Sequence, residues 1–400
     1  MELPRIISVD DHVLEPGDLW ERYLPSALRD SGPHLRRSKG IFLPSTRGAW
    51  KEDQSGDWAD IWTFGDYQMA VIPGFAAAGL DKSYLGEHWD PMTYDQMRAG
   101  AYDPVARLAD LDANHTEASL AFPTFPRFCG QTFLEHPERA LGLACVRAYN
   151  DWMIDEWCGG EGQGRLIPLT LVPLWDPHLA AEEIRRCAAK GSFAMAFSEN
   201  PARLRLPSIH TPHWNPMFAA CEETATVVNL HIGSSSTFPL TSPDAPRAVS
   251  LALTYQGAAH ALCDWLTSGV LDRFPSLKVA LSEGQVGWMP FLLEKLDGIW
   301  HGRAVYGNID QLPAPPSSYM DRMYGCVFDD VVGLQLRAHI GAKQIMFETD
   351  YPHGDSTWPD SSAVLEKIAH EAALSEAEIY DLARGNAIRC YGLERIGITE

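Results

Sequence analysis

Residues 278–300, KVALSEGQVGWMPFLLEKLDGIW, place a short apolar run directly before a segment with helical periodicity. The run Lys278–Gly284 predicts a buried strand, because continuous aliphatic residues are typical of parallel strands covered by helices. In the segment that follows, apolar residues recur three and four positions apart, at Trp288, Phe291, Leu292, Leu296, Ile299 and Trp300. This spacing predicts an amphipathic helix. A strand followed by a helix is the repeating unit of α/β folds.

The same order of strand and helix continues along most of the chain. Eight segments predict strands: Ile6–His12, Ala118–Thr124, Leu166–Leu174, Ala194–Asn200, Thr226–Gly233, Lys278–Gly284, Met323–Asp329 and Gln344–Asp350. Eight such units favour an α/β fold of the (β/α)8 TIM-barrel type over its main rival, a doubly wound open sheet. Because such barrels reach this length with insertions, we expect residues 1–400 to form one domain.

Near the C-terminus, the sequence also predicts where helices begin. Residues 364–372 have helical periodicity, and Ser361 is positioned as the N-cap of that helix. Ser375 opens the next helix, and Glu378 three residues later completes a capping box.

Residues 33–100 interrupt this order between the first strand and the first barrel helix. The segment is rich in Gly, Pro, Asp and aromatic residues, the aromatic ones being Trp50, Trp58, Trp62, Phe64, Tyr67, Phe75, Tyr84, Trp89 and Tyr94. A long excursion from the C-terminal end of a barrel strand lies over the active-site mouth. We therefore interpret residues 33–100 as a lid over a substrate; the alternative is a surface excursion packed by its own aromatics or against a partner subunit.

Composition narrows the choice of partners. The formal net charge is −21 and no Lys/Arg-rich run occurs, which argues against nucleic-acid and membrane partners. The first residues, MELPRIISVDDH, lack the pattern of a signal peptide, and no apolar stretch is long enough to span a bilayer. The eight cysteines form no CxxC pair, which indicates reduced core residues of a cytoplasmic protein. A homo-oligomer is possible, and the composition does not decide the oligomeric state.

Polar residues end four of the predicted strands. Asp10 and His12 end the first and lie two apart, so both point to one face of an extended strand, whereas Asp11 points away. His231 ends the fifth before a Gly/Ser turn, Glu283 ends the sixth, and Asp350 ends the eighth. A lone histidine on an apolar strand is often an ordinary core residue, but functional groups of this fold gather at these strand ends. Together the five residues predict a divalent metal site.

Four further residues are candidates around that site. Glu348 shares the face of Asp350 one layer deeper, and Glu283 and Asp350 are candidates for acid–base work. His353 is placed to meet substrate, unless it is an ordinary loop residue. Glu199 ends the fourth strand, either as a further inward ligand or as a surface residue. Glu15 is close enough to reach the cluster or to orient a ligand.

Five motifs add a family resemblance: DDHVLEP (10–16), LHIG (230–233), SEGQVGWMPFLLEKLD (282–297), FETDYPHGDSTWP (347–359) and NAIRCYGL (386–393). Together they resemble the amidohydrolase superfamily in its amidohydrolase-related (type 2) branch. The resemblance implies a distorted TIM barrel with metal at the strand tips, in a group that includes decarboxylases, lactone hydrolases and other C–C or C–O cleaving enzymes. His12 matches the second histidine of the family's HxH motif, and His231 and Asp350 match its ligands on strands five and eight.

The chain departs from the family pattern at three positions. Asp10 stands where many relatives have the first histidine of HxH. Glu283 stands where decarboxylating relatives usually carry a histidine, which argues against simple decarboxylation. No lysine ends the fourth strand, so a bridging carbamylated lysine is absent, and Glu199 is the residue that could replace it.

The leading hypothesis is a metal-dependent hydrolase that activates water against a small organic acid, ester, lactone or amide with an apolar body. Two enzyme alternatives are a non-heme di-iron or Mn/Fe oxygenase and a non-oxidative decarboxylase; a non-catalytic protein is a third. Because the donor set is rich in carboxylates, we expect iron or manganese rather than zinc. We expect two ions if Glu199 faces inward and one if it does not.

Overall fold

Eight parallel strand positions form a closed barrel in the computed structural model, which describes residues 3–43, 49–81, 90–303, 309 and 312–399. The barrel strands are β1 (Ile6–Val13), β6 (Thr116–Pro123), β7 (Leu166–Ile167), β8 (Leu169–Thr170), β9 (Ala194–Ser198), β10 (Val227–His231), β11 (Val279–Ser282), β12 (Met323–Val327) and β13 (Ile345–Phe347). Short β7 and β8 flank Pro168 and together occupy the third position, since β7 pairs with β6 and β8 with β9. All eight predicted strands are confirmed.

Backbone hydrogen bonds join the last strand position to the first and close the barrel. Asp350 N donates to Asp10 O at 2.9 Å, and His12 N donates to Tyr351 O at 2.6 Å. Two candidate site segments, the ends of β1 and β13, are therefore adjacent in space. The open sheet considered as a rival is excluded, because an open sheet leaves its terminal strands unpaired.

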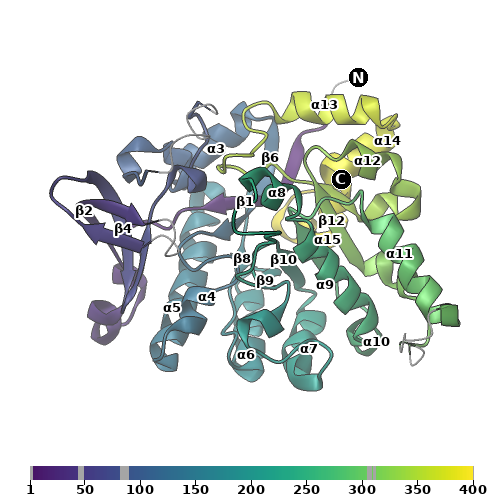
Figure 1. The fold of residues 1–400 in the computed structure, drawn as a ribbon, viewed down its shortest axis with the longest axis horizontal. Helices are drawn as coiled ribbons and strands as arrows, with labels where there is room; N and C mark the ends of the chain where they lie inside the picture. Colours follow the sequence, from purple (N-terminus) through teal and green to yellow (C-terminus); the bar gives the residue numbers. More distant parts are fainter. Residues whose placement is uncertain (1–2, 44–48, 82–89, 304–308, 310–311, 400) are drawn as a thin grey trace.

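Helices surround the barrel (Figure 1). The helices of the barrel units are α3 (Pro104–Ala113), α5 (Arg139–Trp152), α6 (Pro177–Ala189), α7 (Asn215–Thr224), α9 (Gln256–Thr267), α11 (Met289–Gly298) and α13 (Ser361–Glu371). Shorter helices are α1 (Leu19–Tyr23), α4 (Gln131–Glu135), α8 (Arg247–Ala252), α10 (Val270–Arg273), α12 (Val331–Gln335), α14 (Glu376–Tyr380) and α15 (Asn386–Tyr391). Buried aliphatic and aromatic residues of the strands and helices form one continuous core.

Two helix details differ from the sequence prediction. Asp360, not Ser361, is the N-cap of α13; Ser361 is buried, its amide donating to Asn114. Phe291 on α11 was predicted on the buried face but is 72% exposed. The predicted capping box of Ser375 and Glu378 at α14 is confirmed.

The inserted segment forms a small antiparallel sheet beside the barrel. Its strands are β2 (His34–Leu43), β3 (Ala49–Glu52), β4 (Asp57–Phe64) and β5 (Tyr67–Ala70), in the order β3-β2-β4-β5. The sheet projects from one side of the barrel (Figure 1). Trp50 lies in the sheet's own small core, whereas Trp62 packs against Trp20 and Phe125 in the main core. Of the predicted aromatics, Tyr84 and Trp89 lie outside the described residues.

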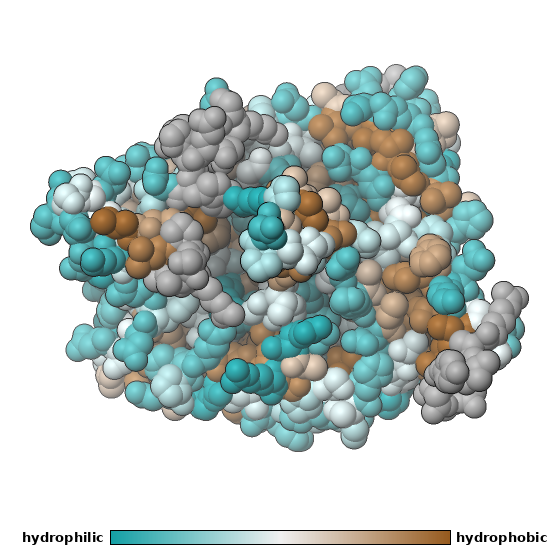
Figure 2. Space-filling model, in the orientation of Figure 1, coloured by the Kyte–Doolittle hydropathy of each residue, from teal (hydrophilic) through white to brown (hydrophobic). Residues whose placement is uncertain are grey.

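The surface seen in Figure 2 is mostly hydrophilic, in keeping with the net charge of −21, and hydrophobic residues gather there in separate patches. No helix in the described ranges is both long and apolar enough to cross a membrane. All eight cysteines are free thiols, and seven of them are buried. The cytoplasmic location stays a prediction.

Candidate metal centre at the barrel mouth

Asp10, His12 and His231 form a fully buried group at the C-terminal ends of β1 and β10. The Nε2 atoms of His12 and His231 lie 3.2 Å apart. Asp10 carboxylate oxygens lie 3.7 Å from His12 Nε2 and 3.5 Å from His231 Nε2. The three side chains thus converge from two strands on one point, as expected of ligands to a single ion.

The imidazole of His231 is oriented by the backbone beside it. Its Nδ1 lies 2.6 Å from Ile232 O, and a carbonyl can only accept, so Nδ1 carries the hydrogen. That tautomer leaves the lone pair on Nε2, which faces His12 and Asp10. Phe128 stacks on the ring at 4.1 Å and 15°. The arrangement is typical of a metal-binding histidine held by a neighbouring acceptor.

His12 is also held as a neutral base. Its side chain is 1% exposed, and burial, reinforced by the nearby His353, holds its pKa well below the ordinary value. A neutral imidazole is the form that binds a metal.

A second group shares His12 and adds Glu283, Asp350 and His353. Asp350 Oδ1 lies 3.3 Å from His12 Nε2 and 3.0 Å from His353 Nδ1. The rings of His12 and His353 stack at 3.6 Å and 21°. Unlike the first group, this one is partly open: the side chains of Glu283 and His353 are 14% and 16% exposed. It therefore lies between the buried group and the cavity.

Glu283 and Asp350 reach the cluster from turns rather than from strands. β11 ends at Ser282 and β13 at Phe347, and both acids have left-handed backbone, with φ of +54° and +55°. Residues with side chains rarely adopt this conformation, and where they do it often marks a functional site. The prediction that Glu283 ends the sixth strand was therefore wrong by one residue, although the side chain does reach the centre.

The carboxylates at the centre lack ordinary partners. Among the described residues, neither oxygen of Asp10 and neither oxygen of Asp350 has a hydrogen-bond partner. Burial, followed by the charges of Glu348 and Glu283, raises the pKa of Asp10 well above its ordinary value. Burial and Glu283 do the same to Asp350. Buried carboxylates without a partner are costly, so this donor set fits a bound cation that supplies positive charge.

Glu283 has the opposite electrostatic setting. Its Oε1 lies 3.4 Å from His231 Nε2 and 3.8 Å from His353 Nδ1. Burial acts to raise the pKa of Glu283, but the surrounding imidazoles, His231 first, hold it well below the ordinary value. Without a cation, the site therefore favours the ionised form of Glu283 and the protonated forms of Asp10 and Asp350.

Glu199 does not join either group. Its Oε1 accepts hydrogen bonds from Gly233 N at 3.0 Å, Ser235 N at 3.3 Å and Ser235 Oγ at 2.6 Å. The carboxylate therefore holds the turn that follows His231 instead of pointing at the ligands. The condition that we set for a second, bridged ion is not met in this geometry.

Glu15 and Glu348 also act beside the cluster. Glu15 accepts from Thr124 N at 3.1 Å and Phe125 N at 2.9 Å, so it fixes the loop after β6 that carries Phe128. Burial raises the pKa of Glu15 to about 7. Glu348 lies beneath the centre, fully buried, and its Oε2 accepts from Glu283 N at 3.1 Å. It supports the left-handed turn of Glu283.

Arg107 supports the site from outside the barrel, which the sequence analysis missed. Its guanidinium is fully buried, donates to His12 O at 2.5 Å and lies 3.9 Å from Asp11 Oδ2. Asp11 points away from the ligands, as predicted, but it is buried rather than solvated and accepts from Thr349 Oγ1 and Tyr351 N. The pair thereby ties α3 to both strand ends that carry ligands. A charged residue on a helix gave no sequence signal of this role.

A cavity of about 1030 Å³ borders the second group at His12 and His353. His12 and His353 line one part; Arg127 and Phe128 from the loop after β6, and Arg247 at the start of α8, line another. The sequence analysis missed these last three residues. The insertion supplies Phe42, residues 66–70, Ile72 and Phe75. The segment predicted as a lid therefore does border the cavity, but none of its described tryptophans is among the lining residues.

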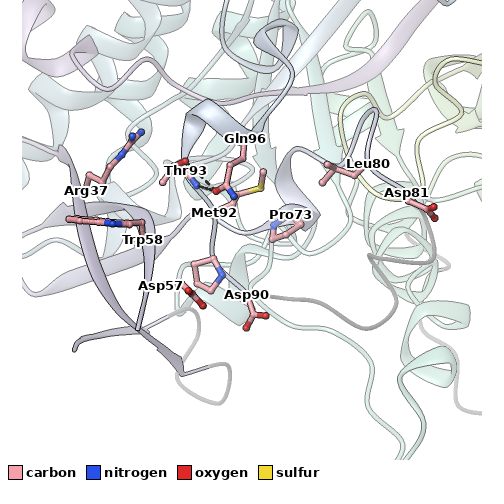
Figure 3. Close-up of a pocket in the computed structure, with 11 residues that line it drawn as sticks. Arg37, Asp57, Trp58, Pro73, Leu80, Asp81, Asp90, Met92, Thr93 and Gln96 are labelled. Carbon is pink, nitrogen blue, oxygen red and sulfur yellow. Dashed lines mark hydrogen bonds between the residues drawn. The ribbon is translucent and has the colours of Figure 1, made fainter. Parts of the chain in front are cut away.

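A different cavity of about 910 Å³ lies within the insertion (Figure 3). Arg37 and Trp58 approach it from the sheet, and Thr93 and Gln96, hydrogen-bonded to each other, approach from the facing segment. Arg37 is neutralised by Asp60 and Asp95. No residue that lines this cavity belongs to the two candidate metal groups, whereas His12 and His353 line the cavity of about 1030 Å³ and Glu283 lines a third one of about 610 Å³.

Comparison with known proteins identifies the family of this chain. The sequence profile of the amidohydrolase family matches residues 65–393, most of the chain. The chain belongs to the amidohydrolase family. The resemblance inferred from the motifs is thus confirmed, and the protein is an enzyme of the amidohydrolase superfamily.

The curated relatives are decarboxylases. The chain is 26% identical to γ-resorcylate decarboxylase of Rhodococcus jostii, over 76% of this chain and 93% of that protein. It is 22% identical to 2-amino-3-carboxymuconate-6-semialdehyde decarboxylase of Dictyostelium discoideum, over 76% of this chain and 81% of that protein. Decarboxylation, which we held as an alternative, is therefore better supported than hydrolysis or oxygenation.

Solved structures share the fold. An amidohydrolase from Mycobacterium avium subsp. paratuberculosis superimposes with a TM-score of 0.72 at 21% identity, covering 98% of this chain and 100% of that chain. A dihydroxybenzoic acid decarboxylase from Polaromonas sp. JS666 superimposes with a TM-score of 0.60 at 16% identity, covering 99% and 100%. That protein was solved with bound manganese and the inhibitor 2-nitroresorcinol.

Proposed function

We propose that this enzyme is a metal-dependent, non-oxidative decarboxylase of an aromatic or other unsaturated carboxylic acid. The observation that carries the proposal is the pair formed by Asp350 and His353, 3.0 Å apart beside a buried group suited to a metal. Decarboxylation needs one charge-neutralising centre and one proton donor, and the two adjacent groups would supply these. The decarboxylase relatives support the same conclusion.

Asp10, His12 and His231 would hold one divalent ion, next to the carboxylates of Glu283 and Asp350. Mixed imidazole and carboxylate donors suit manganese or iron, and we propose one of these rather than zinc. When bound, the ion would neutralise the substrate carboxylate and a neighbouring substrate oxygen. We propose a single ion, because Glu199 is engaged by the loop at residues 233–235.

Asp350 would act as the proton donor. In the absence of a cation, burial and Glu283 raise its pKa, which favours the protonated form that a proton donor needs. As the bond between the substrate carbon and its carboxylate breaks, the electron pair stays on carbon and CO₂ leaves. Asp350 then gives its proton to that carbon, so the acid anion and one proton become the shortened product and CO₂. His353, which borders the cavity, would return a proton to Asp350 from solvent.

Glu283 stands where decarboxylating relatives usually carry a histidine, which argued against decarboxylation in the sequence analysis. A neighbouring histidine in the structure answers this objection. His353 Nδ1 lies 3.8 Å from Glu283 Oε1, so an imidazole from the turn after β13 stands next to the β11 end. His353 would therefore provide the imidazole that Glu283 does not.

The test measures CO₂ release and product formation from 2,6-dihydroxybenzoate and related hydroxybenzoates with manganese-loaded enzyme, beside ester and lactone hydrolysis. Replacing Asp350 by Asn should lower kcat by about 10²–10⁴-fold, the usual contribution of a general acid. Asp321→Asn, an exposed aspartate just before β12 that lies outside both groups, is the matched control and should retain activity. Hydrolysis of esters or lactones without any CO₂ release would refute the proposal.

A further inference from the structure

The cavity above the metal centre is unusually large for a one-ring acid. Its volume of about 1030 Å³ stands at the upper end of the roughly 300–1000 Å³ typical of sites that enclose drug-sized ligands. A head group bound beside His12 and His353 would occupy only the end nearest the barrel. The remaining volume therefore either holds a further part of the substrate or is filled by water.

The insertion gives the cavity an apolar wall, which includes Phe42, Tyr67, Met69, Ile72 and Phe75. Phe128, which stacks on His231, belongs to the end at the metal centre. Apolar surface is favourably covered by apolar ligand atoms, at about 25 cal/mol per Å² buried.

Charge along the wall does not favour a second anionic group. Arg127 forms an ion pair with Glu135 at 2.9 Å and also donates to Ser236. Asp66 and Arg247 add one charge of each sign to the lining. The far part of the cavity therefore selects an uncharged, apolar body rather than a diacid.

We infer that the substrate is an extended acid: a carboxylate-bearing ring at the metal end, with an apolar substituent that reaches the wall made by the insertion. The inference rests on the proposed function for the chemistry of the head group, whereas the size of the body rests on the cavity. Ile72 and Phe75 are then specificity-determining residues. Both are only partly buried, so their side chains have surface to offer a ligand.

The probes are 2,6-dihydroxybenzoate and its derivative with a pentyl group at position 4, opposite the carboxylate. Manganese-loaded enzyme should decarboxylate the pentyl acid with at least about a tenfold higher kcat/KM, since burying several CH₂ groups at about 0.8 kcal/mol each more than supplies that factor. Independently of turnover, calorimetry should show that the product 5-pentylresorcinol binds more tightly than resorcinol by a similar factor.

Enlarging the wall residues tests their role. Ile72→Trp, and Gln68→Trp as a second variant in case the first does not fold, should each reduce the pentyl-to-unsubstituted ratio of kcat/KM at least tenfold. Val105→Trp is the matched control, because Val105 is 59% exposed on α3 and does not line the cavity. That variant should keep the wild-type ratio.

The outcomes separate the two proposals. CO₂ release from both acids without preference for the pentyl acid, or a ratio unchanged in both wall variants, would overturn the extended substrate and leave decarboxylation standing. Tight binding of 5-pentylresorcinol that the wall variants weaken, without CO₂ from either acid, would support the extended body and overturn decarboxylation. Equal binding of both resorcinols would overturn the inference.

Discussion

The buried carboxylates of Asp10 and Asp350 favour a bound cation at the mouth of the barrel. Both carboxylates are buried, and none of their four oxygens has a hydrogen-bond partner among the described residues. An ionised carboxylate in such a place costs several kcal/mol unless a positive charge faces it. His12 cannot supply that charge, because burial holds its pKa well below the ordinary value. A bound divalent ion would resolve this imbalance.

We predict that His231→Ala loses the metal and retains the fold. The substitution removes one of three converging donors, so metal content should fall from about one ion per chain to near zero, with activity lost. Elemental analysis and circular dichroism measure the two effects.

Glu199→Gln serves as the control for that experiment. Its carboxylate is buried in the same barrel mouth but is bonded to the turn at residues 233–235. We expect it to keep one ion per chain. A metal-replete, active His231→Ala protein would contradict the ligand assignment, and a halved metal content in Glu199→Gln would restore the two-ion centre.

Residue patterns predicted the identity of the cluster better than its surroundings. Asp10, His12 and His231 follow from strand alternation and from the ends of apolar runs, both of which are local features of the sequence. The contacts of Glu199 and Arg107 depend on how distant segments pack, and no local pattern encodes them. For the same reason, no local pattern indicated that Asp11 would be buried against a helix.

The strands could be predicted from the sequence because each of them is a short apolar run. The exact ends of the strands could not be predicted, because Glu283 and Asp350 have positive φ values that their residue types do not indicate. Helix starts show the same limit. Ser375 was correctly identified by its partner Glu378, whereas Ser361, with no such partner, was misplaced by one residue.

The capping box at α14 gives a pH-dependent prediction. A hydrogen bond from Arg337, with help from the backbone amide of Ser375, lowers the pKa of Glu378 to about 2 from an ordinary 4.5. A lowered pKa in the folded state stabilises the protein fully above the unfolded value, and that contribution is lost as pH falls from about 4.5 towards 2. Because the side chain is 31% exposed, we expect about 1 kcal/mol at neutral pH.

Urea unfolding of Glu378→Gln and wild type between pH 7 and pH 3 measures this effect. The two curves should differ at pH 7 and approach each other below pH 4. Glu376→Gln in the same turn is the control for loss of charge alone. A difference between Glu378→Gln and wild type that stays constant down to pH 3 would show that the ion pair does not contribute as argued.

The insertion shares its hydrophobic core with the barrel and does not pack as a separate unit. Trp62 on β4 is 1% exposed and packs on Trp20 at 5.2 Å and on Phe125 at 4.9 Å, both outside the insertion. Its Nε1 donates to Tyr94 Oη at 3.3 Å, and Tyr94 donates to Glu15 O at 2.8 Å. The sequence analysis favoured a lid and gave packing by aromatics as the alternative, because wall residues and core residues of this segment are both aromatic.

We therefore predict opposite consequences for two tryptophans of one strand. Trp62→Ala should cost about 3–5 kcal/mol of unfolding free energy, the usual range for a large aromatic removed from a core. Trp58 on the same strand is 55% exposed, so Trp58→Ala should change stability by less than about 0.5 kcal/mol. Neither lines the cavity above the metal centre, so KM in the folded fraction should stay near the wild-type value. Denaturant unfolding followed by circular dichroism and fluorescence should give one transition for all three proteins, because the insertion shares its core with the barrel. A separate early transition in Trp62→Ala, with the barrel still folded, would instead mean that the insertion is an independent unit resting on the barrel.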